Sequence, residues 1–291
     1  MTSLLPERVA TPPADMLWLD ITRKCQLECG HCYNESGPDG GHGQMSSSDW
    51  CTVIDQAVLS GVRRIQVIGG EPTLHPDMLA IVGHALNAGL DVEVYSNLVH
   101  VTDRMWKVFR RPGMSLATSY YSSTAAEHDA VTNRRSHART RANIAKAVSL
   151  GIRLRVGIVA AGETDTGTDS AETRRDLEAM GVAPERIRVD RVREFGRAGQ
   201  DHAPAVENLC GSCGTGKAAV GPDGRVSLCV FSAGWMTVGT VPKTPLADIL
   251  TGSEMAQATA TIRTTVRDAR GCDPDEECTP GGPLSGCNPR Y

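Results

Sequence analysis

Three cysteines within eight residues, Cys25, Cys29 and Cys32, constrain this chain more than any other feature. Their CxxxCxxC spacing follows the apolar segment 17–21, which has the composition of a buried β-strand. The cysteines therefore lie on the loop that leaves the C-terminal end of that strand. Three thiolates on one short loop can hold one metal centre, and they leave one iron of a four-iron cluster without a protein ligand. A zinc site is the alternative, although structural zinc normally takes four ligands.

The remaining cysteines lie far from this loop. Of the ten cysteines in 291 residues, six fall between positions 210 and 287, and none lies between Cys51 and Cys210. Spaced cysteines in an intracellular chain more often bind metal than form disulfides. The distribution therefore predicts two separate metal regions. Cys51, which follows Trp50 on an expected helix, is interpreted as a small buried residue.

Charge and hydropathy exclude several classes of partner. The net charge is -4, which does not favour a nucleic-acid-binding surface. The chain has no run of 18 apolar residues that would predict a transmembrane helix, and its first 14 residues lack the basic-then-apolar order of a signal peptide. We expect a cytoplasmic protein that binds neither nucleic acid nor a membrane.

Strands and helices alternate regularly after the first 15 residues. The expected strands cover residues 16–22, 65–68, 92–95, 114–120, 154–159 and 187–192. Expected helices cover 49–60, 76–87, 102–109, 137–150 and 170–180. Six β/α units in succession predict an α/β fold with a parallel sheet, a partial (β/α)6 TIM-like barrel. In such folds the chemistry lies at the C-terminal ends of the strands.

The pattern changes near residue 205. Gly221-Pro-Asp-Gly224 predicts a hairpin turn between strands 218–220 and 226–230, and a helix is expected over 245–262. The tail from Cys272 is too poor in apolar residues to form a core, so a metal would have to order it. We divide the chain into an N-terminal leader, a barrel and a small cysteine-rich C-terminal domain, at residues 1–15, 16–204 and 205–291.

Two motifs together resemble those of the radical S-adenosylmethionine (SAM) enzymes. The first is the cysteine loop, with the ring of His31 directly before Cys32. The second is Gly69-Gly-Glu-Pro72, which follows the second expected strand and is similar to the GGEP motif of that family. The resemblance covers about residues 16–197. Read alone, Gly-Gly-Glu-Pro is an ordinary strand-to-helix turn.

The resemblance implies a [4Fe-4S] cluster whose open iron binds the amino and carboxylate groups of SAM. It also implies reductive cleavage of SAM to a 5′-deoxyadenosyl radical, which abstracts hydrogen from a substrate. Gly69 and Gly70 would let the backbone approach the methionine part of SAM, and Glu71 would accept a hydrogen bond from its ammonium group.

Further positions are assigned by the same resemblance. Ser96, Asn97 and Ser119 match positions that hold the ribose and methionine groups, although each is also typical of turns and caps. Arg139 and Arg141 lie near where some relatives place a carboxylate-binding arginine, and exposed helix charge is the alternative. The segment 193–197 resembles the one that flanks adenine. Tyr120 and Tyr121 face the barrel mouth or pack as core aromatics.

The C-terminal cysteines resemble a SPASM/twitch extension. Cys213, followed by Gly224 and Cys229, matches the opening of that pattern, and Cys210 forms a CxxC pair with Cys213. The later CxxCx5CxxxC block is absent, since Cys272, Cys278 and Cys287 are more widely spaced. The resemblance implies at least one auxiliary [4Fe-4S] cluster, with these six cysteines as candidate ligands. A zinc ribbon is the alternative.

The expected function is radical SAM modification of a ribosomally synthesised peptide by crosslinking, epimerisation or oxidation. The expected partners are a reductant such as flavodoxin or ferredoxin and a separate peptide-recognition protein. One alternative is dehydrogenation or epimerisation of a small molecule such as an aminoglycoside precursor. Another is a non-catalytic zinc or iron-sulfur protein. No residue is assigned as a catalytic acid or base.

Overall fold

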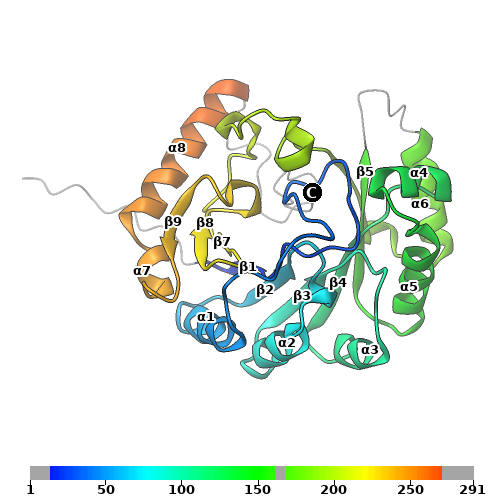
Figure 1. The fold of residues 1–291 in the computed structure, drawn as a ribbon, viewed down its shortest axis with the longest axis horizontal. Helices are drawn as coiled ribbons and strands as arrows, with labels where there is room; N and C mark the ends of the chain where they lie inside the picture. The colour runs from blue at the N-terminus through cyan, green and yellow to red at the C-terminus, as the bar shows by residue number, and fades with distance from the viewer. Residues whose placement is uncertain (1–13, 161–167, 271–291) are drawn as a thin grey trace, which may run out of the picture.

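In the computed structural model, residues 14–160 and 168–270 are described, and they form one nine-stranded sheet with helices outside it (Figure 1). The sheet order is β6-β5-β4-β3-β2-β1-β7-β8-β9. The first six strands are β1 (Met16–Asp20), β2 (Arg64–Ile68), β3 (Asp91–Tyr95), β4 (Met114–Ser119), β5 (Leu154–Ala160) and β6 (Ile187–Arg191). They are parallel and follow sequence order, which confirms the predicted α/β class and partial (β/α)6 arrangement.

The apolar strands form where the sequence predicts them. Strands of a parallel sheet are buried on both faces and need nearly continuous apolar sequence. In β1, Leu17, Trp18 and Leu19 are at most 2% exposed. The register pairs Met16 with Arg64 and Asp20 with Ile68, so β1 and β2 end at the same level. The loops that follow the two strands therefore lie side by side.

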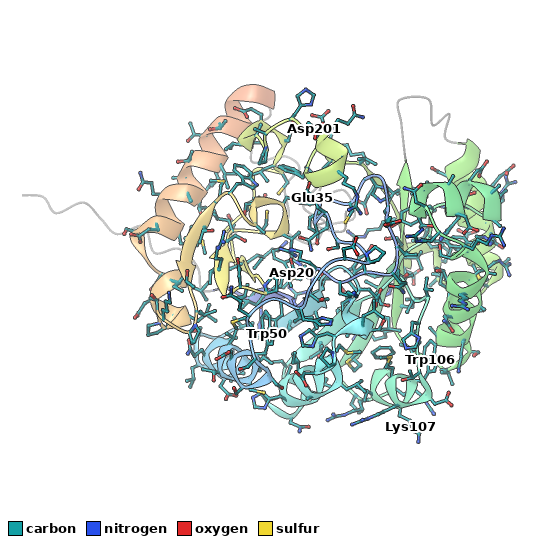
Figure 2. All side chains as sticks on the ribbon, in the orientation of Figure 1. Asp20, Glu35, Trp50, Trp106, Lys107 and Asp201 are labelled. Atoms are coloured by element: carbon teal, nitrogen blue, oxygen red, sulfur yellow. The ribbon has the colours of Figure 1, made fainter. Side chains whose placement is uncertain are left out.

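Helices cover the outer side of the six parallel strands. They are α1 (Ser47–Leu59), α2 (Met78–Asn87), α3 (Asp103–Phe109), α4 (Ala125–Thr132), α5 (His137–Ser149) and α6 (Thr168–Ala179). Ser46 caps α1 through a capping box with Asp49, which satisfies the unpaired N–H groups of the first turn. Figure 2 shows Trp50 on the sheet side of α1 and Lys107 pointing outward from α3, as the apolar periodicity requires. Short 3-10 turns occur at Pro72–Leu74, Pro184–Arg186, Gly196–Gly199, Val206–Asn208 and Val230–Ser232.

The C-terminal region continues the sheet. Strand β7 (Lys217–Val220) pairs in parallel with β1, and β8 (Arg225–Ser227) returns antiparallel to it after the predicted turn. Strand β9 (Thr237–Thr240), which the sequence analysis missed, forms the edge. The predicted strand over 226–230 ends earlier, because Val230 begins a 3-10 turn.

Two helices replace the single one that was predicted after residue 245. They are α7 (Leu246–Leu250) and α8 (Ser253–Arg270), and the helical conformation is interrupted between them at Gly252. Both pack against β9 on the outer side of the sheet (Figure 1). A domain boundary near residue 205 stays a prediction.

In the part of the chain that the structure describes, no helix has both the length and the apolar character needed to cross a bilayer.

Candidate functional site

The cysteine loop lies over the C-terminal ends of the parallel strands. The loop folds back on itself through a bridge in which Cys25 N donates to Gly37 O at 3.0 Å and Gly37 N donates to Arg23 O at 3.2 Å. Its three cysteines line one pocket with residues that follow β2, β3 and β4. The lining residues are Cys25, Leu27, Cys29, His31, Cys32, Tyr33, Ser36, Ile68, Gly69, Gly70, Tyr95, Asn97, Ser119, Tyr121 and Arg197. The pocket has a volume of about 100 Å³ and is partly open to solvent.

The two glycines after β2 pack directly on the backbone of the cysteine loop. A Cβ on Gly69 would lie 2.6 Å from Thr22 O, and one on Gly70 would lie 2.5 Å from Lys24 O. Gly70 N donates to Thr22 O at 2.6 Å, and Glu71 N donates to Lys24 O at 2.8 Å. Glycine is therefore needed here so that the turn can hold the start of the cysteine loop.

Glu71 lies beneath the pocket and is fully buried. Its Oε1 accepts from Thr73 N at 3.0 Å, Thr73 Oγ1 at 2.7 Å and Ser96 Oγ at 2.8 Å. Its Oε2 accepts from Asn97 N at 2.7 Å. Burial raises the pKa of Glu71, and these four donors oppose the rise. The carboxylate thus fixes the turn after β3, a role that the assignment as a cofactor ligand did not anticipate.

Among the residues that follow β3 and β4, one supports the wall of the pocket and others line the pocket itself. Ser96 is buried and acts as support, since its hydroxyl donates to Glu71 and accepts from Leu98 N. Asn97 reaches the pocket, where its Nδ2 lies 3.7 Å from Cys25 Sγ. Ser119 also lines the pocket and hydrogen-bonds to Tyr95 through the two hydroxyls at 2.9 Å.

The two candidate arginines on α5 lie outside this pocket. Arg139 is exposed on α5 and does not line this pocket, and Arg141 forms an ion pair with Asp176. The arginine of the pocket is Arg197, whose Nε donates to Cys29 O and whose Nη2 donates to Ser36 O, both at 2.8 Å. The short segment 193–197 was singled out from the sequence only through its family resemblance, and nothing in its composition identifies this contact.

His31 and Tyr121 form the aromatic side of the pocket. Their rings meet edge to face with centroids 5.1 Å apart. Burial lowers the pKa of His31 to about 4, with a smaller contribution from Arg197, so the ring is neutral at physiological pH. Tyr121 lines the pocket, whereas the buried Tyr120 packs against the buried His128 and the partly exposed His137. Of the two roles expected for these neighbouring tyrosines, Tyr121 faces the barrel mouth and Tyr120 packs as a core aromatic.

The second group of cysteines also converges. Cys210 Sγ and Cys213 Sγ are 3.7 Å apart, and Cys213 hydrogen-bonds to Cys229. Hydrogen bonds to both neighbours, together with burial, raise the pKa of Cys213. The predicted ligands Cys272, Cys278 and Cys287 lie outside the described residues.

An aromatic cluster lies between the two cysteine groups. The ring of Tyr33, next to Cys32, packs 5.0 Å from Phe231, which lies two residues after Cys229. Phe231 also contacts Phe195 at 5.3 Å. The two cysteine groups are thus joined by side-chain packing as well as by the shared sheet.

The donor set of the first group fits an iron-sulfur cluster. Three thiols from one loop face one pocket, and burial raises the pKa of Cys29 to about 12, so the Cys29 thiol is protonated until a metal displaces its proton. Within the described ranges, no three His, Cys, Asp or Glu side chains are arranged around a single ion. The glycine turn and Asn97 add backbone and amide groups to the pocket wall, and such groups suit an amino-acid-like ligand.

Comparison with known proteins agrees with this geometry. The model of the radical SAM superfamily matches residues 19–175, more than half of the chain, and the model of an iron-sulfur cluster-binding domain (SPASM) matches residues 191–279. The PqqA peptide cyclase of Streptomyces rochei is 30% identical over 149 residues, which are 50% of this chain and 40% of that protein. Other curated relatives are matched over as little as 20% of their length.

Solved structures share the fold. Streptococcus suis SuiB bound to precursor peptide SuiA has a TM-score of 0.71 at 12% identity, covering 86% of this chain and 67% of SuiB. BtrN in complex with AdoMet and 2-DOIA has a TM-score of 0.51 at 16% identity, covering 88% of this chain and 89% of BtrN. The chain belongs to the radical SAM superfamily, whose cofactors are a [4Fe-4S] cluster and SAM, and it carries a C-terminal auxiliary iron-sulfur domain.

Proposed function

We propose that this chain is a radical SAM enzyme that modifies a ribosomally synthesised peptide. The observation that carries the proposal is the single pocket that joins the three cysteines to the Gly69-Gly70 turn and the polar ends of β3 and β4. When bound there, the cluster and SAM supply reductive cleavage to a 5′-deoxyadenosyl radical that abstracts hydrogen from the substrate. The bond that is formed, whether a crosslink, an epimerised centre or an oxidised side chain, is left open.

The chain's own residues bind and orient in this proposal. Cys25, Cys29 and Cys32 hold the cluster, and Asn97 and Ser119 present hydrogen-bonding groups to the methionine and ribose parts of SAM. Glu71 acts indirectly, because its carboxylate fixes the backbone of Asn97. Arg197 ties the cysteine loop to the segment after β6, which keeps the pocket wall closed on that side.

Cys210, Cys213 and Cys229 hold an auxiliary cluster in this proposal, and the tail cysteines are candidates for the remaining ligands. A peptide substrate is supported by the peptide cyclase name of the curated relatives and by the peptide bound to SuiB. A flavodoxin or ferredoxin as electron donor, a separate peptide-recognition protein and a cytoplasmic location complete the proposal.

A small-molecule substrate is the second candidate. It is favoured by the extent of the match to BtrN, since each chain covers nearly nine-tenths of the other and the BtrN structure holds 2-DOIA. A non-catalytic zinc or iron-sulfur protein is the third candidate, and it predicts no reaction with SAM.

Anaerobic reconstitution tests the proposal. The chain is loaded with iron and sulfide, reduced with dithionite in the presence of SAM, and assayed for 5′-deoxyadenosine. We expect 5′-deoxyadenosine from the wild type and none from the variant in which Cys25, Cys29 and Cys32 are alanine. A fully loaded wild type that forms no 5′-deoxyadenosine would contradict the proposed enzyme.

A further inference from the structure

Exposed arginines border the cysteine loop where this loop reaches the outside of the protein. Gly30, directly after Cys29, is exposed, and so are Arg134, Arg135 and Arg139, which are named here the arginine surface. We propose that the arginine surface docks an acidic electron-carrier protein, such as reduced flavodoxin or ferredoxin, which reduces the first cluster. The inference rests on the proposed function, because it needs a cluster that takes up an electron.

Backbone hydrogen bonds attach the cysteine loop to the end of α4, which lies beside the loop in Figure 1. Glu28 N donates to Thr132 O at 3.1 Å, and Gly30 N donates to Val131 O at 3.2 Å. Both neighbours of Cys29 are thus bonded to α4. The segment that follows α4 and carries the arginines is therefore held next to a cluster ligand.

The charge of the arginine surface is only partly neutralised by ion pairs. Arg134 pairs with Glu28 at 2.6 Å, and the Arg134 side chain remains 49% exposed. Arg135 and Arg139 are exposed and form no ion pair with any residue that the structure describes. Two guanidinium groups are therefore available to a partner.

This part of the protein is positive although the whole chain is negative. Residues 25–32 and 133–139 contain three arginines and one glutamate, which give a formal charge of +2, whereas the whole chain carries -4. The neighbouring Asp129 is turned to the backbone, since its Oδ1 accepts from Ser136 N and His137 N, both at 2.9 Å. An acidic protein is therefore attracted to this face and repelled by the negative remainder of the chain.

Arg139 lies where helix stability does not favour a cation. It is in the first turn of α5, which contains no acidic residue, and a positive charge there opposes the helix dipole. The next residue, Thr140, is buried, and its Oγ1 donates to Asn97 O at 2.9 Å. Because Asn97 lines the cluster pocket, Arg139 adds positive charge close to that pocket at the expense of helix stability.

The step that this contact serves is the transfer of one electron. The reduced carrier loses the electron and is oxidised, the cluster gains it and is reduced, and no covalent bond or proton changes place. Electron-transfer encounters use small interfaces, and complementary charge raises their association rate in a salt-sensitive way. Three arginines next to the exposed Gly30 suit an encounter of this kind.

Two matched double variants test the proposal. Arg135→Glu/Arg139→Glu reverses the charge of the arginine surface, and Arg110→Glu/Arg153→Glu is the control. Arg110 and Arg153 are also exposed, but they precede β4 and β5 and so lie at the opposite end of these strands from the cysteine loop. Each double variant takes the formal net charge from -4 to -8, because each Arg→Glu change lowers it by two.

Reduction of the cluster is measured with and without a docking protein. The full chain, loaded with iron and sulfide, is mixed anaerobically with flavodoxin hydroquinone and SAM at low ionic strength, and the absorbance of flavodoxin follows its oxidation. Light with 5-deazariboflavin, a small uncharged electron source, reduces the same cluster without docking. The affinity of oxidised flavodoxin for each loaded protein is measured separately, because it does not depend on turnover.

We expect Arg135→Glu/Arg139→Glu to lower the second-order rate constant with flavodoxin about tenfold and to weaken the binding of oxidised flavodoxin, whereas the control stays within about twofold of wild type. Added salt should slow the wild type more than the reversed variant, since salt screens the attraction. Reduction by 5-deazariboflavin should be equal in all three proteins. Arg135→Gln/Arg139→Gln, which only removes the charges, decides the matter if the reversed variant binds less iron.

The outcomes separate the two proposals. Equal rates of the two double variants with flavodoxin would overturn the inference and leave the proposed function intact. A wild type that 5-deazariboflavin reduces, but that neither flavodoxin nor ferredoxin reduces, would do the same. Equal slowing of the reversed variant with 5-deazariboflavin and flavodoxin would also overturn it, since the substitutions would then act on the cluster itself. No 5′-deoxyadenosine from loaded wild type reduced by 5-deazariboflavin would contradict the proposed function, on which the inference rests.

Discussion

The two cysteine groups of this protein are built in different ways. The first takes all three thiols from one loop, and the pocket around it is completed by residues that follow neighbouring parallel strands. The second brings Cys210 and Cys213 together with Cys229, which follows the β7–β8 hairpin. A short motif can thus specify the first site locally, whereas the second depends on tertiary contacts. The difference predicts that the groups respond differently to substitution.

The largest effect is expected from the first group. Changing Cys25, Cys29 and Cys32 to alanine should remove about four irons per chain and abolish 5′-deoxyadenosine formation, since a [4Fe-4S] cluster needs its thiolates. Iron analysis and product assay measure both. Unchanged iron content would show that the loop is not the ligand set and would remove the basis of the comparison.

The second group should affect iron more than SAM cleavage. Cys213→Ala should also remove about four irons per chain, while formation of 5′-deoxyadenosine without substrate stays within about tenfold of wild type. Iron analysis of the wild type sharpens the comparison, because about eight irons mean one auxiliary cluster and about twelve mean two. If Cys213→Ala cleaves no SAM although its first cluster is loaded, the two groups are not independent.

The glycine turn tests how tightly the first site is packed. Gly70→Ala places a Cβ against Lys24 O and should lower the free energy of unfolding by about 3 kcal/mol, the upper end of typical overpacking costs. Gly30→Ala in the same loop is the control, since its Cβ would meet no atom within 4 Å, and it should change stability by less than about 0.5 kcal/mol. Urea unfolding of the metal-free proteins measures both. Equal stability of the two variants would contradict the close packing.

The smallest effect distinguishes the two arginines. Arg197→Ala removes two hydrogen bonds to loop carbonyls and should lower the free energy of unfolding by about 1.5 kcal/mol. Arg139→Ala removes an exposed side chain and should stay within about 0.5 kcal/mol of wild type, with unchanged SAM affinity. Urea unfolding and equilibrium SAM binding measure these effects. A loss of SAM binding in Arg139→Ala alone would support Arg139 as a cofactor-binding residue.

The fold was predictable where local sequence and tertiary environment agree. Strands such as β1 are apolar because both faces are buried, and α1 shows its cap and its apolar periodicity openly. Helix α4 was missed because it buries His128 and Thr132, polar residues that carry no apolar signal. Strand β9 was missed because Thr237–Thr240 is short and has one buried residue. It pairs with β8 across an intervening turn region, and a local sequence pattern does not predict such a pairing.

The candidate site was predictable to the level of motifs. The cysteines, Gly69, Gly70, Asn97 and Ser119 line one pocket, as expected for residues at strand ends. The positions of Glu71 and Ser96 below the pocket could not be foreseen, because a motif gives spacing and not the side to which a carboxylate turns. Arg197 and Tyr121 reach the pocket through contacts with a loop more than 80 residues earlier, and nothing in their neighbouring sequence carries that information.

The parallel pairing of β1 with β7 has a consequence for assembly in the cell. Met16 pairs with Lys217, so the strand that precedes the cysteine loop gains its second neighbour only after about 200 further residues have been synthesised, at the entropic expense of a long loop closure. The β2 side of that strand is available much earlier. Iron delivered during translation would meet a cysteine loop anchored on one flank, and iron delivered after release would meet one anchored on both. The pairing of β1 with β7 thus makes the structure of the cysteine loop at the time of metal binding depend on whether the chain is complete.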